Sequence, residues 1–228
     1  MFVLENVIKR YSRRGKEVVA FRADHLEIAV GSYTAVVGPS GSGKTTLLSL
    51  LGGMLSPTDG RVLFDGASVY DLPISGRTRL RRTRIGFVFQ TFNLVPYLSA
   101  LENVQVPLSL AGKPAKVQRQ RAGHLLQQVG LSDRVDHKPC ELSTGQQQRV
   151  ALARTLANDP EVILADEPTG NLDPESRATV LSFFDNLHRA GKTILMVTHD
   201  AVATIRASSR LSLRNGLLSP EEELQRAA

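Results

Sequence analysis

The chain has 228 residues, of which 42% are hydrophobic and 22% charged, ordinary proportions for a globular protein with one core. No apolar run approaches the roughly 18 residues of a membrane span, and residues 1–6 lack the basic start and apolar stretch of a signal peptide. A single cysteine, Cys140, excludes an internal disulfide and a cysteine-cluster metal site, which is typical of a reducing cytosol. The net charge of +6 is compatible with nucleotide, lipid head groups or nucleic acid as partners, and does not choose among them.

The first thirty residues predict a β-rich opening. Strand-like runs cover 2–4, 18–21 and 26–30, and the basic segment 9–16 is predicted to be a loop. Tyr11 lies in that segment, where its ring could stack on an adenine. By itself, the local sequence favours a surface tyrosine on a hairpin.

Residues Gly38–Thr45 carry the pattern G-x-x-x-x-G-K-[ST] of a phosphate-binding loop. An apolar run fit for a buried strand, 33–37, precedes the pattern, and a helix-length apolar segment, 46–51, follows it. In this context the glycines turn backbone N–H groups onto a polyphosphate, and the helix N-terminus adds positive potential. Lys44 is predicted to reach the β- and γ-phosphates, and the Thr45 hydroxyl to bind Mg²⁺. The predicted nucleoside-triphosphate site comprises Gly38, Ser40, Gly41, Ser42, Gly43, Lys44, Thr45 and Thr46.

The middle of the chain begins with its most basic run, Arg77–Arg84, which is more typical of a solvated helix face than of a membrane or partner surface. A buried-type strand over 85–89 is followed by Gln90, at the strand end where ligands bind in open α/β sheets. Residues 91–112 are predicted to be loop-rich. Their apolar cluster at 92–98 suggests a docking surface, with ordinary core packing as the alternative.

Two helices are predicted next, over 113–132 and from Ser143 to about Ala157. The first has apolar residues at helical spacing on one face. Ser143 with Gln146 three residues later is a capping box, and it leaves backbone N–H groups at an anion-binding helix start.

Polar residues follow two further buried-type strands. The run 162–165 ends in Asp166 and Glu167, the usual partners of a phosphate-binding loop: one acid helps to hold Mg²⁺ and the next can activate water. Asp173 precedes Pro174 and is predicted to cap a helix. The run 193–197 ends before His199, which we interpret as functional because it is the third polar group at such a strand end. A short exposed helix is predicted from residue 219.

In this order the motifs closely resemble the ATP-binding cassette of ABC transporters, over almost the whole chain. Gly38–Thr45 resembles Walker A, Gln90 the Q-loop glutamine, and Leu142–Gln146 the signature. Val162–Asp166 resembles Walker B, Glu167 the catalytic glutamate, Asn171–Asp173 the D-loop and His199 the switch histidine. Tyr11 resembles the adenine-stacking aromatic of the family. The resemblance thus reverses the interpretation of Tyr11 as a surface tyrosine. One departure is Thr144, where the family signature has its first glycine.

The resemblance implies an α/β fold with a RecA-like core (1–90 and 158–228), an N-terminal antiparallel β region and an inserted helical signature subdomain at about 91–157. It also implies a head-to-tail homodimer around two ATP. Catalysis would fall to Lys44, Gln90, Glu167 and His199, and Mg²⁺ binding to Thr45, Gln90 and Asp166. The second protomer would contribute Ser143, Gly145 and Gln146 to the nucleotide, with Asp173 close by. These implications are those of the family, and rest on the motifs quoted above.

Segments around Asn93–Val104 and Leu164–Asp173 further resemble the bacterial lipoprotein-release, macrolide-export and cell-division ATPases. The implied partner is a separate membrane permease, with the chain on the inner face of the cell membrane in the cytoplasm and no nucleic acid expected. The alternatives are a DNA-repair or translation ATPase of the same superfamily. Those carry a long coiled coil, zinc modules or a second cassette between or beside these motifs, and this sequence has none of them.

Overall fold

A computed structural model describes residues 1–13 and 15–220, and within this part of the chain seven α-helices accompany one ten-stranded sheet. The helices are α1 (Lys44–Leu51), α2 (Ile74–Thr83), α3 (Ala100–Leu110), α4 (Ala115–Gln128), α5 (Thr144–Thr155), α6 (Pro174–Arg189) and α7 (Ala201–Arg206). The strands are β1 (Phe2–Arg13), β2 (Lys16–Ile28), β3 (Tyr33–Val37), β4 (Asp59–Phe64), β5 (Ala67–Ser68), β6 (Ile85–Val88), β7 (Val162–Asp166), β8 (Thr193–Thr198), β9 (Ser209–Arg214) and β10 (Leu217–Pro220).

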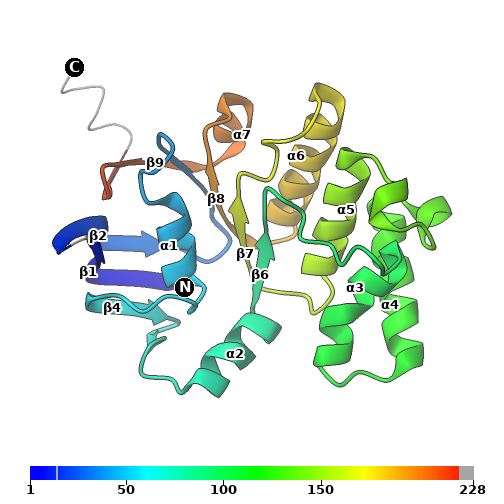
Figure 1. The fold of residues 1–228 in the computed structure, drawn as a ribbon, viewed down its shortest axis with the longest axis horizontal. Helices are drawn as coiled ribbons and strands as arrows, with labels where there is room; N and C mark the ends of the chain where they lie inside the picture. The colour runs from blue at the N-terminus through cyan, green and yellow to red at the C-terminus, as the bar shows by residue number, and fades with distance from the viewer. Residues whose placement is uncertain (14, 221–228) are drawn as a thin grey trace.

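The sheet has a parallel and an antiparallel part, in the order β5-β4-β1-β2-β10-β9-β3-β8-β7-β6. Strands β9, β3, β8, β7 and β6 pair parallel with one another, and β5, β4, β1 and β2 pair antiparallel with one another. Strand β10 joins the two parts, parallel to β2 and antiparallel to β9. In Figure 1 helix α1, which follows the predicted phosphate-binding loop, lies between the two parts. The predicted α/β class with an N-terminal antiparallel region is confirmed.

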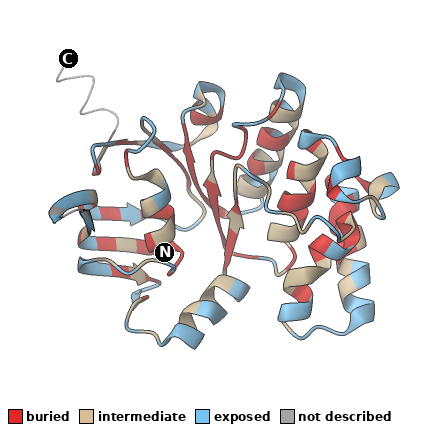
Figure 2. Cartoon of the chain, viewed as in Figure 1, coloured by how far each residue is buried: buried red, intermediate tan, exposed pale blue. Residues whose placement is uncertain are grey.

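Three apolar clusters hold these layers together. The first joins α1 to the antiparallel strands and to one face of β7 and β8; the second packs the opposite face of the parallel strands against α6. The third lies among α3, α4 and α5. Figure 2 shows buried positions running along the central strands and the inner faces of these helices. Strands β3, β7 and β8 are buried on both faces, as their continuous apolar runs predict.

The opening hairpin corrects the predicted loop at 9–16. Strand β1 continues to Arg13 and β2 begins at Lys16, with Tyr11 opposite Val18. Backbone pairing across an exposed hairpin does not require apolar side chains, so a basic, polar segment extends both strands.

Helix α3 corrects the loop-rich prediction for 91–112. Ser99 and Glu102 form a capping box at its start, and the fully buried Asn103 uses its amide nitrogen to donate to the carbonyl oxygens of Val95, Leu98 and Ser99 at 3.0–3.2 Å. Asn103 therefore fastens the preceding loop to the helix. Pro107 inside the helix weakens its sequence signal.

The apolar segment 92–98 is only partly a surface. Phe92 packs against the cluster on α6 and Leu94 against the helical cluster, while Tyr97 is 74% exposed. Of the predicted C-terminal helix, Ser219 and Pro220 belong to β10, and 221–228 lie outside the described residues.

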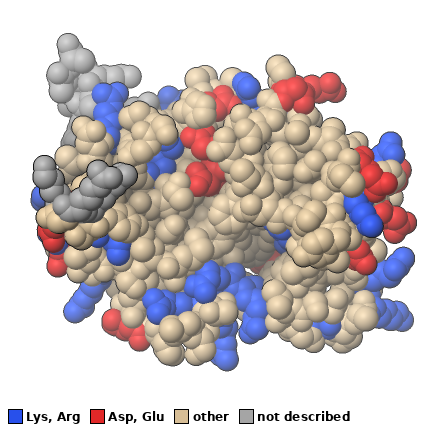
Figure 3. Space-filling view, in the orientation of Figure 1, with Lys and Arg blue, Asp and Glu red and all other residues tan. Residues whose placement is uncertain are grey.

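Most of the basic run lies in α2, which contains no buried residue, and Arg84 is the C-cap of this helix. Arg84 forms ion pairs with Asp65 and Glu161, which hold its pKa above the usual range for arginine. In Figure 3 blue side chains gather over α2 at the lower edge of the molecule. The expected exposed helix face is present, and Arg84, which follows the helix, is held in these ion pairs.

Candidate active site

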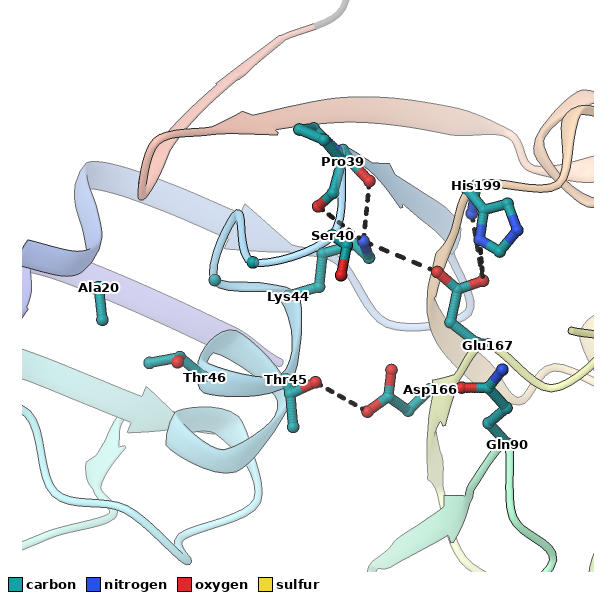
Figure 4. Close-up of a pocket in the computed structure, with 13 residues that line it drawn as sticks. Ala20, Pro39, Ser40, Lys44, Thr45, Thr46, Gln90, Asp166, Glu167 and His199 are labelled. Carbon is teal, nitrogen blue, oxygen red and sulfur yellow. Dashed lines mark hydrogen bonds and ion pairs between the residues drawn. The ribbon is translucent and has the colours of Figure 1, made fainter.

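A cavity of about 660 Å³ opens at the carboxyl ends of the parallel strands. The loop after β3, the two acids at the end of β7, the histidine after β8 and the glutamine beyond β6 all reach it (Figure 4). The lining residues are Ala20, Gly38, Pro39, Ser40, Gly41, Gly43, Lys44, Thr45, Thr46, Gln90, Asp166, Glu167 and His199.

The loop before α1 requires glycine at two positions. Gly43 has φ of 107°, and a Cβ there would overlap the carbonyl oxygen of Ala20 on β2. A Cβ on Gly38 would overlap the carbonyl oxygen of Leu213 on β9 and lie 2.7 Å from Ser42 Oγ. Gly43 is also the N-cap of α1 and places no capping side chain over the first helical N–H groups, so the helix start presents an uncapped anion site to the cavity.

Lys44 bridges the loop and the acids. Its Nζ donates to the carbonyl oxygens of Gly38 and Pro39, at 2.8 and 3.1 Å, and lies 3.7 Å from Glu167 Oε1. Figure 4 shows this ammonium group between the loop and Glu167. The side chain is 11% exposed, so its charge acts in a partly desolvated place.

Thr45 and Asp166 are joined by a hydrogen bond, in which the Thr45 hydroxyl donates to Asp166 Oδ2 at 3.0 Å. Burial raises the pKa of Asp166, and the hydrogen bond from Thr45 opposes that shift. Hydroxyl and carboxylate oxygens are ligands that Mg²⁺ prefers, and Mg²⁺ is commonly held by one or two carboxylates plus substrate phosphates. Among the described residues, no group of three or more His, Cys, Asp or Glu side chains is placed to hold a metal ion.

Glu167 is held by its neighbours in a backbone conformation that is uncommon for its residue type. It has φ of 46°, and its backbone N–H donates to the Val197 carbonyl oxygen at 2.9 Å. His199 approaches Oε2 with Nδ1 at 2.9 Å and donates its backbone N–H to it at 3.2 Å. The carboxylate thus lies between Lys44 and His199, fixed on both oxygens and 11% exposed.

Gln90 lines the same cavity from the end of β6. Its amide nitrogen lies 3.4 Å from Asn171 Oδ1, and Asn171 Nδ2 donates back to the Gln90 carbonyl oxygen at 3.2 Å. The loop beyond Gln90 is tied to α5, because Arg154 donates to the carbonyl oxygens of Phe92 and Asn93 at 2.7 and 2.5 Å. Burial lowers the pKa of Arg154.

Several predicted residues do not line this cavity. The side chain of Ser42 is buried behind the loop, and its hydroxyl has no partner among the described residues. Tyr11 is 44% exposed on β1 and lies near Lys9, whose Nζ is 5.4 Å from the ring centroid. Asp173 caps α6 through the N–H groups of Glu175 and Ser176, and hydrogen bonds from Ser176 lower its pKa. The predicted capping role of Asp173 is confirmed.

The residues at the start of α5 also lie outside the cavity. Ser143 and Gln146 form the predicted capping box, and Ser143 and Thr144 are exposed. Gly145 is buried, because it packs against Ser176 of α6: a Cβ on Gly145 would overlap Ser176 Oγ and lie 2.7 Å from Ser176 Cβ. This requirement for glycine within one protomer was not visible in the sequence, since it depends on how closely α5 and α6 approach.

Sequence reasoning missed two supports of the site. The Ala20 carbonyl that restrains Gly43 comes from the hairpin, and backbone contacts of this kind carry no residue signature. The pairing of Asn171 with Gln90 joins segments 81 residues apart. The sequence placed Asn171 in the segment that resembles the D-loop, but it could not show that Gln90 is its partner.

Comparison with known proteins gives the same picture. The family model described as ABC transporter matches residues 21–170. A protein of Thermotoga maritima named an uncharacterized ABC transporter ATP-binding protein is 47% identical over 213 residues, covering 93% of this chain and 91% of its own. The macrolide export ATP-binding/permease protein MacB of Syntrophobacter fumaroxidans is 46% identical over 96% of this chain, which spans only 31% of that longer protein.

Among solved structures, a dimer of the ATP-binding cassette MJ0796, in a post-hydrolysis state bound to ADP and Pi, superposes with a TM-score of 0.89 at 39% identity. The match covers 96% of this chain and 98% of that one. Sequence family, relatives and fold therefore agree, and the protein belongs to the ABC transporter family, as one of its ATP-binding cassettes, which are ATPases.

Proposed function

We propose that two copies of this chain bind two Mg·ATP head to tail and hydrolyse them to drive a separate membrane permease. The observation that carries the proposal is the division of the predicted site residues. Lys44, Glu167 and His199 meet in one cavity, whereas Ser143 and Thr144 are exposed elsewhere on the same chain. A second copy, arranged head to tail, would supply the missing helix start to each cavity.

In the proposed reaction the uncapped start of α1 and Lys44 hold the β- and γ-phosphates. Mg²⁺ bound at Thr45 and Asp166, with Gln90 beside it, would neutralise charge on those phosphates. Glu167 would accept a proton from the attacking water, and His199 would hold both this carboxylate and the γ-phosphate. Lys44 leaves its loop carbonyls for phosphate oxygens, which compensate the charge better than neutral acceptors.

A mixing experiment tests the head-to-tail arrangement. Lys44→Ala removes the loop half of every site, and Ser143→Arg blocks the helix-start half with a long cation at an exposed position. Each variant alone should be inactive. In an equal mixture, half the dimers contain one intact composite site, so about a quarter of the wild-type ATPase rate should return. A mixture as inactive as its components would contradict the arrangement. Circular dichroism checks that both variants are folded, and Ser143→Lys replaces Ser143→Arg if that variant unfolds.

Tyr11 is proposed to stack on the adenine, since the β1–β2 hairpin that carries it also contributes Ala20 to the cavity. Tyr11→Ala is expected to weaken ATP binding by about 1–3 kcal/mol, with a similar loss for GTP, because every base has a π-face. Nucleotide titration measures the effect. Val18→Ala, the exposed cross-strand neighbour, is the matched control and should leave affinity unchanged. An unaltered dissociation constant for Tyr11→Ala would leave Tyr11 with a surface role only.

The permease is proposed to dock at a groove of about 540 Å³ between α2, β6, α3 and α5. Phe87 and Phe89 stack in its wall with ring centroids 5.7 Å apart, and Arg154 in the same wall holds the loop after Gln90. An occupant of this groove could thus act on the nucleotide site through one loop. This replaces the expected surface at 92–98, where Phe92 and Leu94 are engaged in packing.

The substrate class proposed is lipid, lipoprotein or drug-like molecules moved outward or extracted from the membrane, by resemblance to the export group and to the MacB relatives. The proposed location is the cytoplasmic face of the cell membrane. Among the described residues no helix has the length and apolarity to cross a bilayer. A role in DNA repair or translation has no specific support in the site.

A further inference from the structure

The positive charge of this chain is concentrated in one segment. Residues 72–132 contain nine of its 28 Lys and Arg but only one of its 22 Asp and Glu, so this segment carries +8 and the remainder −2. The only acid in the segment is Glu102, whose carboxylate is used in the capping box of α3. The net positive charge of the protein is therefore carried by this segment and not by the rest of the chain.

The arginines of α2 are not compensated by acids. Among the described residues, Arg77, Arg79, Arg81 and Arg82 form no ion pair; Arg81 donates to the Gly53 carbonyl oxygen and Arg82 to that of Leu110, at 3.0 and 3.1 Å. Neutral acceptors orient these guanidinium groups without cancelling their charge. An anionic partner is the natural complement of such a surface.

Exposed aliphatic side chains lie in the same surface. Ile74 at the start of α2 is 74% exposed, and Leu110 at the end of α3 is 69% exposed. Arg79 and Arg82 are exposed on α2, as Ile74 is, and Lys113 lies in the turn between Leu110 and α4. We call Ile74, Arg79, Arg82, Leu110 and Lys113 the basic rim. Figure 1 places α2 and the α3–α4 turn along one lower edge, and Figure 3 shows the basic side chains over α2 there.

We propose that the basic rim contacts the anionic head groups of the membrane beside the permease. Cations that surround single aliphatic side chains match an interface in which head-group phosphates meet the guanidinium groups and the outermost acyl region receives Ile74 and Leu110. A nucleic-acid backbone would use the charges but not the aliphatic side chains. The orientation rests on the proposed docking groove, which Arg82 and Leu110 also border, so that groove and rim would face the bilayer together.

The affinity of the basic rim for the membrane is the sum of small contributions from its side chains. Each cationic side chain near an anionic bilayer raises the partition coefficient about fivefold, and the effect decays over the Debye length of about 8 Å at physiological salt. Contact of this kind is reversible and leaves ATP hydrolysis in solution untouched. It would hold the cassette in register with the membrane during cycles in which the dimer opens.

The test is flotation of the full-length protein with vesicles. Wild type should float with phosphatidylcholine vesicles that contain about one third phosphatidylglycerol and stay behind with pure phosphatidylcholine. The triple variant Ile74→Ser, Arg79→Gln, Lys113→Gln should lose about 25-fold or more of the partition coefficient, since two cations are removed. The matched control Val30→Ser, Arg61→Gln, Lys138→Gln changes exposed residues of the same types elsewhere and should float like wild type.

Three results would overturn the proposal. The first is a wild-type protein that does not bind anionic vesicles at about 0.1 M salt, and the second is an equal loss of vesicle binding in the rim variant and its control. The third is a rim variant that floats like wild type but no longer co-purifies with the permease. The last result would assign the rim to the protein partner. ATPase rates of all three proteins in solution, expected to be equal, separate these outcomes from failure of the proposed ATPase function.

Discussion

Replacing Glu167 by Gln is expected to lower ATP turnover by about a hundred- to ten-thousandfold while ATP binding survives. The amide keeps the size of the carboxylate and its place between Lys44 and His199, but it cannot accept the proton of the attacking water. Removal of a negative charge near the phosphates favours the ATP-bound state of the protein. The variant should therefore accumulate as an ATP-bound dimer.

Gel filtration with ATP and Mg²⁺ measures this accumulation, and a steady-state assay measures turnover. Glu17→Gln, an exposed carboxylate on β2, is the control and should behave as wild type in both measurements. A Glu167→Gln protein with near wild-type turnover would exclude Glu167 as the base. The water would then have to be activated by another group in the cavity.

Substitution at Gly145 is expected to have the second large effect, for two separable reasons. A Cβ here would overlap Ser176, so even Gly145→Ala should cost about 1–3 kcal/mol of unfolding free energy as α5 is pushed from α6. Gly145→Asp with Ser143→Ala adds a carboxylate at the proposed anion site and should reduce ATPase activity by about a hundredfold or more. Thr144→Gly alters an exposed residue and should change turnover by less than about tenfold.

Thermal unfolding and ATPase assays together distinguish packing from chemistry. Gly145→Ala with Ser176→Gly removes both overlapping atoms of Ser176 and should recover most of the lost stability. If Gly145→Ala melts like wild type, α5 and α6 tolerate the side chain and the packing argument is wrong. If Thr144→Gly alone activates an otherwise inactive protein, the departure from the family signature marks a cassette that needs a different partner cassette.

Much of the site could be predicted from the sequence, because its residues come directly after the ends of strands in the chain. The loop before Lys44 follows β3, Asp166 and Glu167 close β7, and His199 closes β8. Continuous apolar runs identify buried parallel strands, and a polar residue just beyond each must emerge at the same edge of the sheet. The cavity confirms that these groups meet, although their roles in catalysis remain predictions.

Other features depended on contacts that no local pattern encodes. The strand order, with β8 between β3 and β7, brings His199 to within hydrogen-bonding distance of Glu167. The hairpin at 9–16 is held by backbone pairing, which is indifferent to side-chain polarity, and α3 is anchored by a buried Asn103 that serves the loop before it. Nor could the sequence show that Gly145 is needed for the approach of α6.

The sequence by itself determined the family, and it predicted the nucleotide site and its reacting groups, since these predictions rest on short motifs whose spacing the chemistry of phosphate binding restricts. Only the tertiary structure showed which of the predicted site residues meet within one chain. The chain's own cavity holds Lys44, Glu167 and His199, while Ser143 and Gly145 lie away from it at the start of α5. The physical reason is that sheet order and helix packing arise when apolar faces of segments distant in sequence are buried against each other. An apolar pattern shows that a face is buried, but which segment covers it is known only from the folded chain.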